Sequence, residues 1–293
     1  MFTILVTGAD GQVGSELKEL ANNSNNLSWF FFNKSEWDIS SQQKTEEILS
    51  LYLPNVLINT AAYTKVDLAE KEPELCYEIN TVSVQILASA CIEKNIKFIH
   101  FSSDYVFHSE KPDPIKEDMP LHPKGIYADS KAKSEALIAL INPQAIILRS
   151  SWIYSYYGHN FVKTMLKLGK INNQVSVVND QIGSPTYALD LANMLIFLID
   201  HLRTEGIDSI QGVFHYSNEG SLSWYEFACE IFTHCNLPVK VIPISTKVFN
   251  APAPRPKFSV LDCSKIKTTL GISIPFWKDS LHHCLNRLKM EKD

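Results

Sequence analysis

The chain has 293 residues, of which 45% are hydrophobic and 20% are charged, and its formal net charge is −5. This composition is ordinary for a soluble globular protein, and the length suits one large α/β domain or two smaller lobes. The acidic balance gives no reason to expect nucleic acid, and no uninterrupted apolar run approaches the roughly 20 residues of a membrane span. The six cysteines form no CxxC pair. We therefore expect a cytoplasmic protein with reduced thiols, without a membrane partner or a cysteine-bound metal.

Short apolar strands alternate with helical segments through the first half of the chain. Strands are predicted at residues 2–6, 27–32, 56–58, 97–101 and 145–148, with helices between them. Strands this apolar leave no face for water, which favours a parallel sheet covered by helices on both sides. The expected fold class is therefore α/β, a Rossmann-type doubly wound parallel sheet with a smaller C-terminal substrate lobe. A dinucleotide should bind at the carboxyl ends of the strands.

The regular alternation ends after Arg149. Strands are predicted at 175–178 and 212–216, helices at 160–168, 187–203 and 224–235, and a proline-rich stretch at 252–256. We expect residues 1–150 to form the dinucleotide-binding domain, with residues 180–218 returning to it. Residues 151–179 and 219–293 should form the substrate lobe.

A glycine-rich turn joins the first strand to the first helix. Gly8 permits the tight turn, Gly11 lets the backbone approach a pyrophosphate, and Gly14 lets the helix pack on the strand. The backbone N–H groups of Gln12 and Val13, at the start of the helix, would meet the phosphates. The alternative is a plain glycine turn without a ligand.

The end of the second strand normally selects between NAD and NADP. Here it runs into Asn33-Lys34-Ser35, with no acid until Glu36, which favours NADPH over NADH because an acid would bond the 2′-OH of NAD. Asp38-Ile39 lies further on, where an Asp could bond the adenine amino group. A place in the N-terminal region of the next helix is an equally good reading of Asp38.

The third strand runs into small residues that suit a bound dinucleotide. Ala61, Ala62, Tyr63 and Thr64 follow its end, and their backbone could lie against the cofactor. For Ala61, simple close packing is a fair alternative.

A hydroxyl, a tyrosine and a lysine follow the fourth strand. Ser102 and Ser103 stand where that strand ends, and Tyr127 and Lys131 are four residues apart, so they share one helix face. The Lys131 ammonium should lower the pKa of Tyr127, ordinarily about 10, so that the tyrosine can exchange a proton with a sugar hydroxyl or ketone. This is oxidoreductase chemistry. The alternative for either serine is a side chain that stabilises a turn.

At this point the chain resembles the extended short-chain dehydrogenase/reductases and, within them, the dTDP-4-dehydrorhamnose reductase family. The resemblance covers essentially the whole chain, and its DYVF and NDQxGxPT runs are more specific than the glycine turn. They separate this group from most sugar-nucleotide epimerases. The motifs lie at residues 8–14, 59–67, 103–107, 127–131, 149–154, 160–161, 179–186 and 255–256.

The resemblance implies reduction of the 4-keto group of a dTDP-sugar by NADPH or NADH, in the synthesis of cell-surface polysaccharide precursors. It makes Tyr127 the proton donor, and it has Lys131 lower the pKa of that tyrosine and hold the nicotinamide ribose. Ser103, rather than Ser102, takes the place usually filled by threonine, so the hydroxyl is kept. A homodimer is consistent with this family.

The substrate residues implied by the resemblance are Ser103, Asp104, Trp152 and Arg255. For Trp152, the alternative is a core tryptophan after a strand. Some members carry a metal at a dimer interface. Glu16 could match one of its acids, but Leu189-Asp190 does not reproduce the second cluster, so no metal is predicted.

Two other classes remain open. A sugar-nucleotide epimerase or dehydratase would retain its NAD, and a dehydratase should show an Asp-Glu pair where this chain has only Asp104. A non-catalytic regulatory subunit is the second alternative, against which the intact Ser103, Tyr127 and Lys131 weigh.

Overall fold

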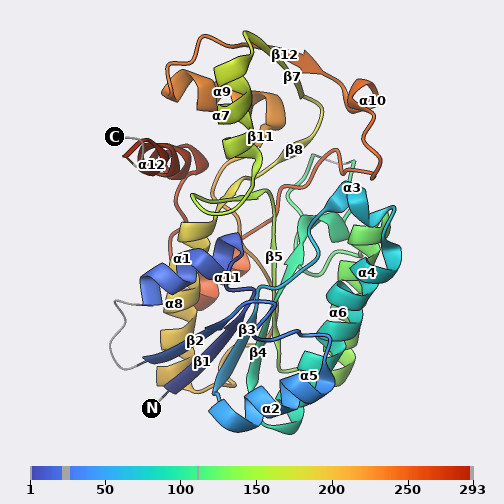
Figure 1. Cartoon of the computed structure of the whole chain (residues 1–293), viewed down its shortest axis with the longest axis vertical. Coiled ribbons are helices and arrows are strands. Elements are labelled where there is room, and N and C mark those ends of the chain that lie inside the picture. Colours follow the sequence, from blue (N-terminus) through green and yellow to red (C-terminus); the bar gives the residue numbers. More distant parts are fainter. Residues whose placement is uncertain (1, 22–26, 111, 291–293) are drawn as a thin grey trace.

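The computed structural model describes residues 2–21, 27–110 and 112–290, and within them lies a six-stranded, all-parallel sheet (Figure 1). The strand order is β10-β5-β4-β3-β1-β2. β2 and β3 flank β1, so the order reverses at β1 and creates the switch point at which open α/β sheets bind ligands. The predicted fold class is confirmed. The strands are β1 (Phe2–Thr7), β2 (Leu27–Phe32), β3 (Val56–Asn59), β4 (Lys97–Ser103), β5 (Ile146–Ser150) and β10 (Gly212–His215).

Helices cover both faces of the sheet. Successive strand residues point to opposite faces, so Ile4 and Val6 enter one core while Leu5 enters the other. Figure 1 shows α1 and α8 on one side and α5 and α6 on the other. The first face carries α1 (Gln12–Ala21), α8 (Ala188–Glu205) and α11 (Ser264–Leu270); the second carries α2 (Gln42–Tyr52), α5 (Ser83–Glu93) and α6 (Ile126–Ile141).

The long helical run between β3 and β4 is continuous but contains a π-helical turn. It consists of α4 (Pro73–Tyr77), the π turn Glu78–Val82 and α5, and the short α3 (Val66–Ala69) precedes it. By length and composition it is the one helical run of the described residues that could cross a membrane, with a mean hydropathy of 1.3. It packs against α6, α2 and β4, which is the position of a core helix.

A smaller group of elements, which we call the cap, lies above the carboxyl ends of the strands (Figure 1). It has its own apolar core, built around Tyr154, Val162, Phe227 and Leu281. The cap consists of α7 (Phe161–Ile171), β7 (Gln174–Val178), α9 (Trp224–His234), β12 (Lys240–Ile244) and α12 (Trp277–Met290). Short segments connect it to the sheet: β6 (Ile153–Tyr154), β8 (Ile182–Gly183), β9 (Thr186–Tyr187), β11 (Leu222–Ser223) and α10 (Thr246–Phe249).

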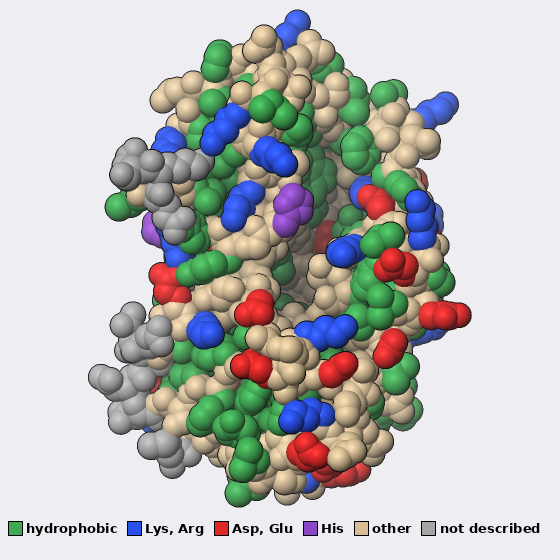
Figure 2. Space-filling model, in the orientation of Figure 1, with side chains coloured by type: hydrophobic (Ala, Val, Ile, Leu, Met, Phe, Trp, Pro, Cys, Tyr) green, Lys and Arg blue, Asp and Glu red, His purple; other side chains and the backbone are tan. Residues whose placement is uncertain are grey.

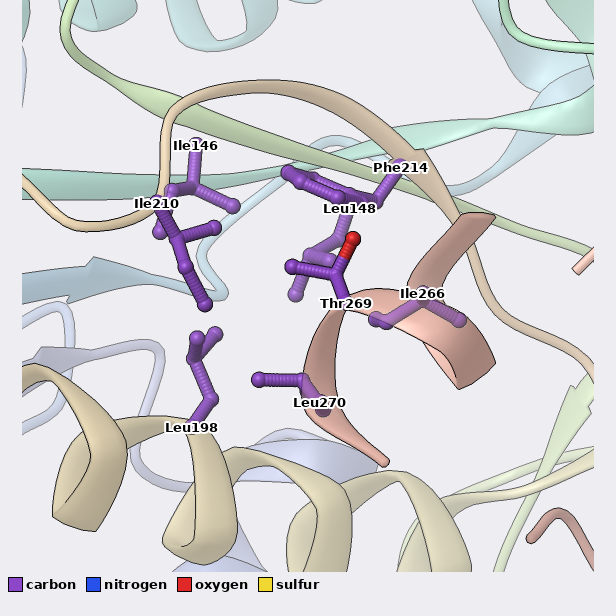
Figure 3. A pocket seen from close by; sticks show the side chains of 8 residues that line it. All are labelled: Ile146, Leu148, Leu198, Ile210, Phe214, Ile266, Thr269 and Leu270. Carbon is purple, nitrogen blue, oxygen red and sulfur yellow. The ribbon is translucent and has the colours of Figure 1, made fainter. Parts of the chain in front are cut away.

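A narrow apolar gap lies between α8, α11 and strands β5 and β10 (Figure 3). It leaves no space for a water molecule, and the hydroxyl of Thr269 is the polar group on its wall. The gap is therefore a feature of core packing and offers no ligand site. Its walls are Ile146, Leu148, Leu198, Ile210, Phe214, Ile266, Thr269 and Leu270.

Candidate active site

The glycine turn is packed too tightly for side chains. Gly8 has a φ of 71°, and a Cβ there would lie 2.7 Å from the Ala61 nitrogen. A Cβ on Gly14 would lie 2.4 Å from the Gly8 oxygen, while the Gly11 N–H donates to that oxygen at 2.9 Å. Because α1 starts at once, its unpaired N–H groups face this turn. The residues present therefore fit the pyrophosphate of a dinucleotide.

Gln12 connects the start of α1 to the segment that leads into the cap. Its Nε2 donates to the Ile153 oxygen at 3.3 Å, and its Oε1 accepts from the Asn160 Nδ2 at 3.0 Å. The side chain of Gln12 is thus occupied by this segment, so a cofactor would meet its backbone. Val13 is buried beside it and packs into the core under the turn.

The end of β2 forms a tight polar corner. The Asn33 Oδ1 accepts from the Ser35 nitrogen at 3.0 Å, and the Glu36 Oε2 accepts from the Asn33 nitrogen at 2.9 Å. Glu36 is the first acidic residue after β2 in the sequence. In the structure its carboxylate lies against the backbone nitrogen of Asn33, at the end of that strand. The Asp38 Oδ1 accepts from the Ser40 nitrogen at 3.1 Å, which holds the pKa of Asp38 down, and Ile39 is buried.

The loop after β3 faces the glycine turn. The Ala61 nitrogen donates to the Asn59 Oδ1 at 3.2 Å, and the Tyr63 nitrogen donates to the Asn80 Oδ1 at 2.8 Å. Ala61 is small because Gly8 approaches it closely, so the packing interpretation of this residue has a physical basis. Ala62 is half-buried and Thr64 is exposed.

Ser103, Tyr127 and Lys131 come together at the carboxyl end of β4. All three side chains are buried, and a hydrogen bond links the Tyr127 hydroxyl to Ser103. The Ser103 Oγ also donates to the Asp104 Oδ1 at 3.0 Å. Among the described residues the neighbouring Ser102 Oγ has no hydrogen-bond partner. The geometry thus separates the two serines, which strand position alone could not.

Burial dominates the electrostatics of this group. It lowers the pKa of Lys131 to about 8 and raises that of Asp104 to about 6, although the Ser259 and Ser103 hydroxyls oppose the second shift. Burial also raises the pKa of Tyr127, while the Ser103 hydroxyl partly offsets the effect. Lys131 is not among the groups that shift the pKa of Tyr127 in this structure, and a lowering of that pKa by Lys131 stays a prediction. The Lys131 Nζ instead donates to the Phe101 oxygen at 2.9 Å.

The two remaining predicted substrate residues lie on segments that join the sheet to the cap. Trp152 has a φ of 48°, and its ring stacks on Trp224 with centroids 3.6 Å apart. A Cβ on Gly183 would lie 2.6 Å from the Trp152 Cε2, so this glycine makes room for the ring. Arg255 pairs with Asp67 at 2.8 Å. Figure 2 shows the molecular face hollowed between the cap and the helices α3 and α4.

Residues 2–290 match the family model described as the RmlD substrate binding domain. The chain belongs to this family. A dTDP-4-dehydrorhamnose reductase of Aggregatibacter actinomycetemcomitans is 40% identical over 288 residues, which cover 96% of this chain and 97% of that relative. The Bacillus subtilis spore coat polysaccharide biosynthesis protein SpsK is 37% identical over 286 residues, or 97% of each chain. The solved structure of a Bacillus anthracis dTDP-4-dehydrorhamnose reductase in complex with NADP has a TM-score of 0.91 at 38% identity, covering 98% of this chain and 100% of that one.

The structure adds a residue to this RmlD-family site that the sequence did not single out. Asn80 lies in the π-helical turn, where its Nδ2 donates to the Ser130 Oγ at 3.1 Å and to the Tyr63 oxygen at 3.0 Å. The Ser130 Oγ donates in turn to the Tyr127 oxygen at 2.7 Å. Asn80 therefore braces the helix of the predicted proton donor. In a regular helical pattern, Asn80 would look like an ordinary polar residue. The π-helical turn, which the sequence pattern does not predict, places its side chain against Ser130.

Glu16, the acid that could match the metal site of some family members, is fully buried. Its Oε1 accepts from the Ser155 Oγ at 2.6 Å, and its Oε2 accepts from the Arg287 Nη1 at 2.8 Å. A guanidinium thus supplies the positive charge beside this carboxylate. Within residues 2–21, 27–110 and 112–290 no group of three or more His, Cys, Asp and Glu side chains is arranged to hold a metal ion.

Proposed function

We propose that this protein reduces the 4-keto group of dTDP-4-dehydro-L-rhamnose to give dTDP-L-rhamnose, with NADPH as the reductant. The observation that carries the proposal is the buried group of Ser103, Tyr127 and Lys131 at the carboxyl edge of the parallel sheet. Its support is the likeness of the chain, over nearly its full length, to proteins named dTDP-4-dehydrorhamnose reductase.

The nucleotide would bind along the edge where β1, β2 and β3 end. The Gly8–Gly14 turn and the start of α1 would hold its pyrophosphate with backbone N–H groups, because glycine at positions 8 and 14 lets the turn pack tightly against Ala61 and Ala9. Asn33, Asp38 and Ile39 would face the adenosine, and residues 61–64 would face the middle of the dinucleotide. The cofactor supplies the hydride that reduces C4. The NADP complex of the Bacillus anthracis relative supports NADPH as this cofactor.

The chain's own contribution to the chemistry is a proton and its positioning. Tyr127, kept neutral by burial, would give its hydroxyl proton to O4 as the ketone becomes an alcohol. Ser103 would hydrogen-bond the same oxygen, as it already does the Tyr127 hydroxyl. Lys131 would hold the nicotinamide ribose, and Asp104, Trp152 and Arg255 would contact the sugar nucleotide.

The proposed domain boundaries follow from which segments pack with the sheet. We propose that residues 1–150, together with 180–218, form the nucleotide-binding part, since β10 pairs with β5 and α8 packs on α1. Residues 151–179 and 219–293 would form the substrate lobe. We further propose a cytoplasmic location, a dTDP-sugar as the small-molecule partner, and no nucleic-acid or membrane partner. A homodimer can be tested by size-exclusion chromatography with light scattering.

The test is turnover with both products followed. Purified protein is incubated with NADPH and dTDP-4-dehydro-L-rhamnose while cofactor absorbance and sugar product are measured together. One NADPH should be consumed for each dTDP-L-rhamnose formed. A new sugar product without loss of NADPH would indicate the epimerase class instead. Well-folded protein that forms no product and consumes no NADPH would indicate the regulatory class.

A further inference from the structure

The extended segment 253–262 runs from the cap back to the sheet and passes beside the predicted active site. The Ile115 nitrogen donates to the Val260 oxygen at 2.9 Å, and the Asp262 nitrogen donates to the Ile115 oxygen at 2.8 Å. We call this stretch the crossing segment. It ties the chain between β12 and α11 to the loop after β4, the strand that ends at Ser103 and is followed by Asp104.

Asp67, at the second position of α3, holds the upper end of the crossing segment. Its Oδ1 accepts from the Arg255 Nη1 at 3.0 Å and from the Ala253 nitrogen at 3.1 Å, and its Oδ2 accepts from the Arg255 Nη2 at 2.8 Å. The hydrogen bonds from Arg255 hold the pKa of Asp67 below its ordinary value, so the carboxylate stays ionised at neutral pH. The two-point geometry fixes the guanidinium in one plane.

Glu70, three residues after Asp67, contacts the start of α6, the helix that carries Tyr127. Its Oε1 accepts from the Ile126 nitrogen at 2.8 Å, directly before Tyr127. A Cβ on Gly125 would lie 2.7 Å from the same Oε1 and 3.1 Å from the Pro254 Cδ of the crossing segment. Glycine is required there because of the φ of 88° and the close approach on both sides. The end of α3, the start of α6 and the crossing segment therefore meet within two residues of Tyr127.

A second contact leads from Arg255 to the same tyrosine. The Arg255 guanidinium lies near the Tyr105 side chain, where burial raises the pKa of that tyrosine and the charge of Arg255 opposes the rise. The Tyr105 ring packs edge-on against the Tyr127 ring, with centroids 5.6 Å apart and an interplanar angle of 84°. A shift of Arg255 would thus reach Tyr127 through packed rings as well as through α3.

We propose that Asp67 and Glu70 are positioning residues that fix the distance between the crossing segment and the hydroxyl of Tyr127. This inference rests on the proposed function. Proton transfer needs donor and acceptor within about 2.6–3.2 Å, and a misplacement of about 1 Å can cost on the order of 10²-fold in rate. The Asp67 side chain is 43% exposed, and ion pairs of that kind contribute little to stability. Their main effect should therefore be on turnover.

The first experiment compares steady-state kinetics of Asp67→Asn and Glu70→Ala. Asp67→Asn should raise KM and lower kcat/KM by about 10- to 100-fold, because Arg255 loses its charged partner. Glu70→Ala removes the oxygen that accepts from the Ile126 nitrogen and should lower kcat by about 10-fold with KM near that of the wild type, since it affects the start of α6 alone. NADPH affinity should stay unchanged in both. The matched control is Asp200→Asn, which removes the partner of Arg203 on the exposed side of α8 and should change nothing.

The double variant tests whether the two acids act together. If they do, its loss in kcat/KM should be clearly smaller than the product of the two single losses. Single variants within threefold of the wild type would overturn the proposal. So would strictly multiplicative losses, which would mean two independent contacts.

Amide hydrogen exchange tests the same link without turnover. Asp67→Asn should speed exchange at the amides of Ala253 and Arg255 and also at residues 126–128, although it removes no bond to α6. Faster exchange confined to Ala253 and Arg255 would overturn the proposed link. This measurement needs no ketosugar, so it is independent of turnover. A wild-type protein that failed to reduce the sugar would disprove the proposed function, while the exchange data would still test the link between Asp67 and α6.

Discussion

Replacing Tyr127 by Phe removes the proton that the proposed reaction needs and little else. The ring stays in its cluster with Tyr63, Ala69 and Cys76, and Ser103 keeps its bonds to Asp104 and to the Tyr105 nitrogen. The stability cost should therefore be about 1 kcal/mol, the net contribution of one hydrogen bond. The rate cost should be about 10²- to 10⁴-fold, the range of general acid catalysis, or about 3–5 kcal/mol of barrier.

The assay follows NADPH absorbance under saturating ketosugar, with NADPH affinity measured by fluorescence titration and stability by urea unfolding. Tyr127→Phe should keep its NADPH affinity within about threefold. The substitution removes only the hydroxyl proposed to protonate the sugar, and it leaves Lys131, proposed to hold the nicotinamide ribose, in place. Tyr77→Phe is the control: the Tyr77 hydroxyl donates to Asp129 on the same helix but outside the site, so its turnover should be unchanged. Near-normal kcat in Tyr127→Phe would refute the assignment of the proton donor.

Other predictions concern the cofactor, the buried charges and the glycine turn. Gly14→Ala should weaken NADPH binding at least tenfold and destabilise by about 1–3 kcal/mol, since its Cβ would lie 2.4 Å from the Gly8 oxygen; unchanged titration and urea curves would contradict this. Asp104, with a pKa raised from 3.8 to about 6, binds a proton more readily folded than unfolded. This carboxyl alone should thus lower stability by about 3 kcal/mol as pH rises through that window, and Asp104→Asn should remove that contribution, measured as the difference between wild-type and variant urea unfolding from pH 4 to 7. Lys131→Ala should lower both turnover and NADPH affinity, and an effect on neither would make its role structural. The corner at Asn33 predicts a kcat/KM with NADPH at least equal to that with NADH, and a strong preference for NADH would be the contrary result.

Sequence patterns predicted the elements whose structure depends on interactions between residues close together in the chain. The apolar run of β1, the glycines after it and the start of α1 lie within about a dozen residues, so periodicity and backbone freedom specify them. The same holds for Tyr127 and Lys131, which one helical turn places on one face. The electrostatics of that pair could not be predicted in this way. The pKa of Tyr127 depends on its burial, and the Lys131 Nζ donates to Phe101, a residue of another element.

By itself, the sequence determined the parallel α/β sheet and predicted its cofactor edge and its reactive side chains, because each depends on spacing within one element or on a motif. The tertiary structure decided how these parts are held against one another. It brought Glu36 back to Asn33, placed Asn80 against Ser130 through a π-helical turn, and joined Asp67 to Arg255 across 188 positions of the chain. Such contacts form between distant segments, and their energies depend on distance and burial, which local sequence spacing does not encode.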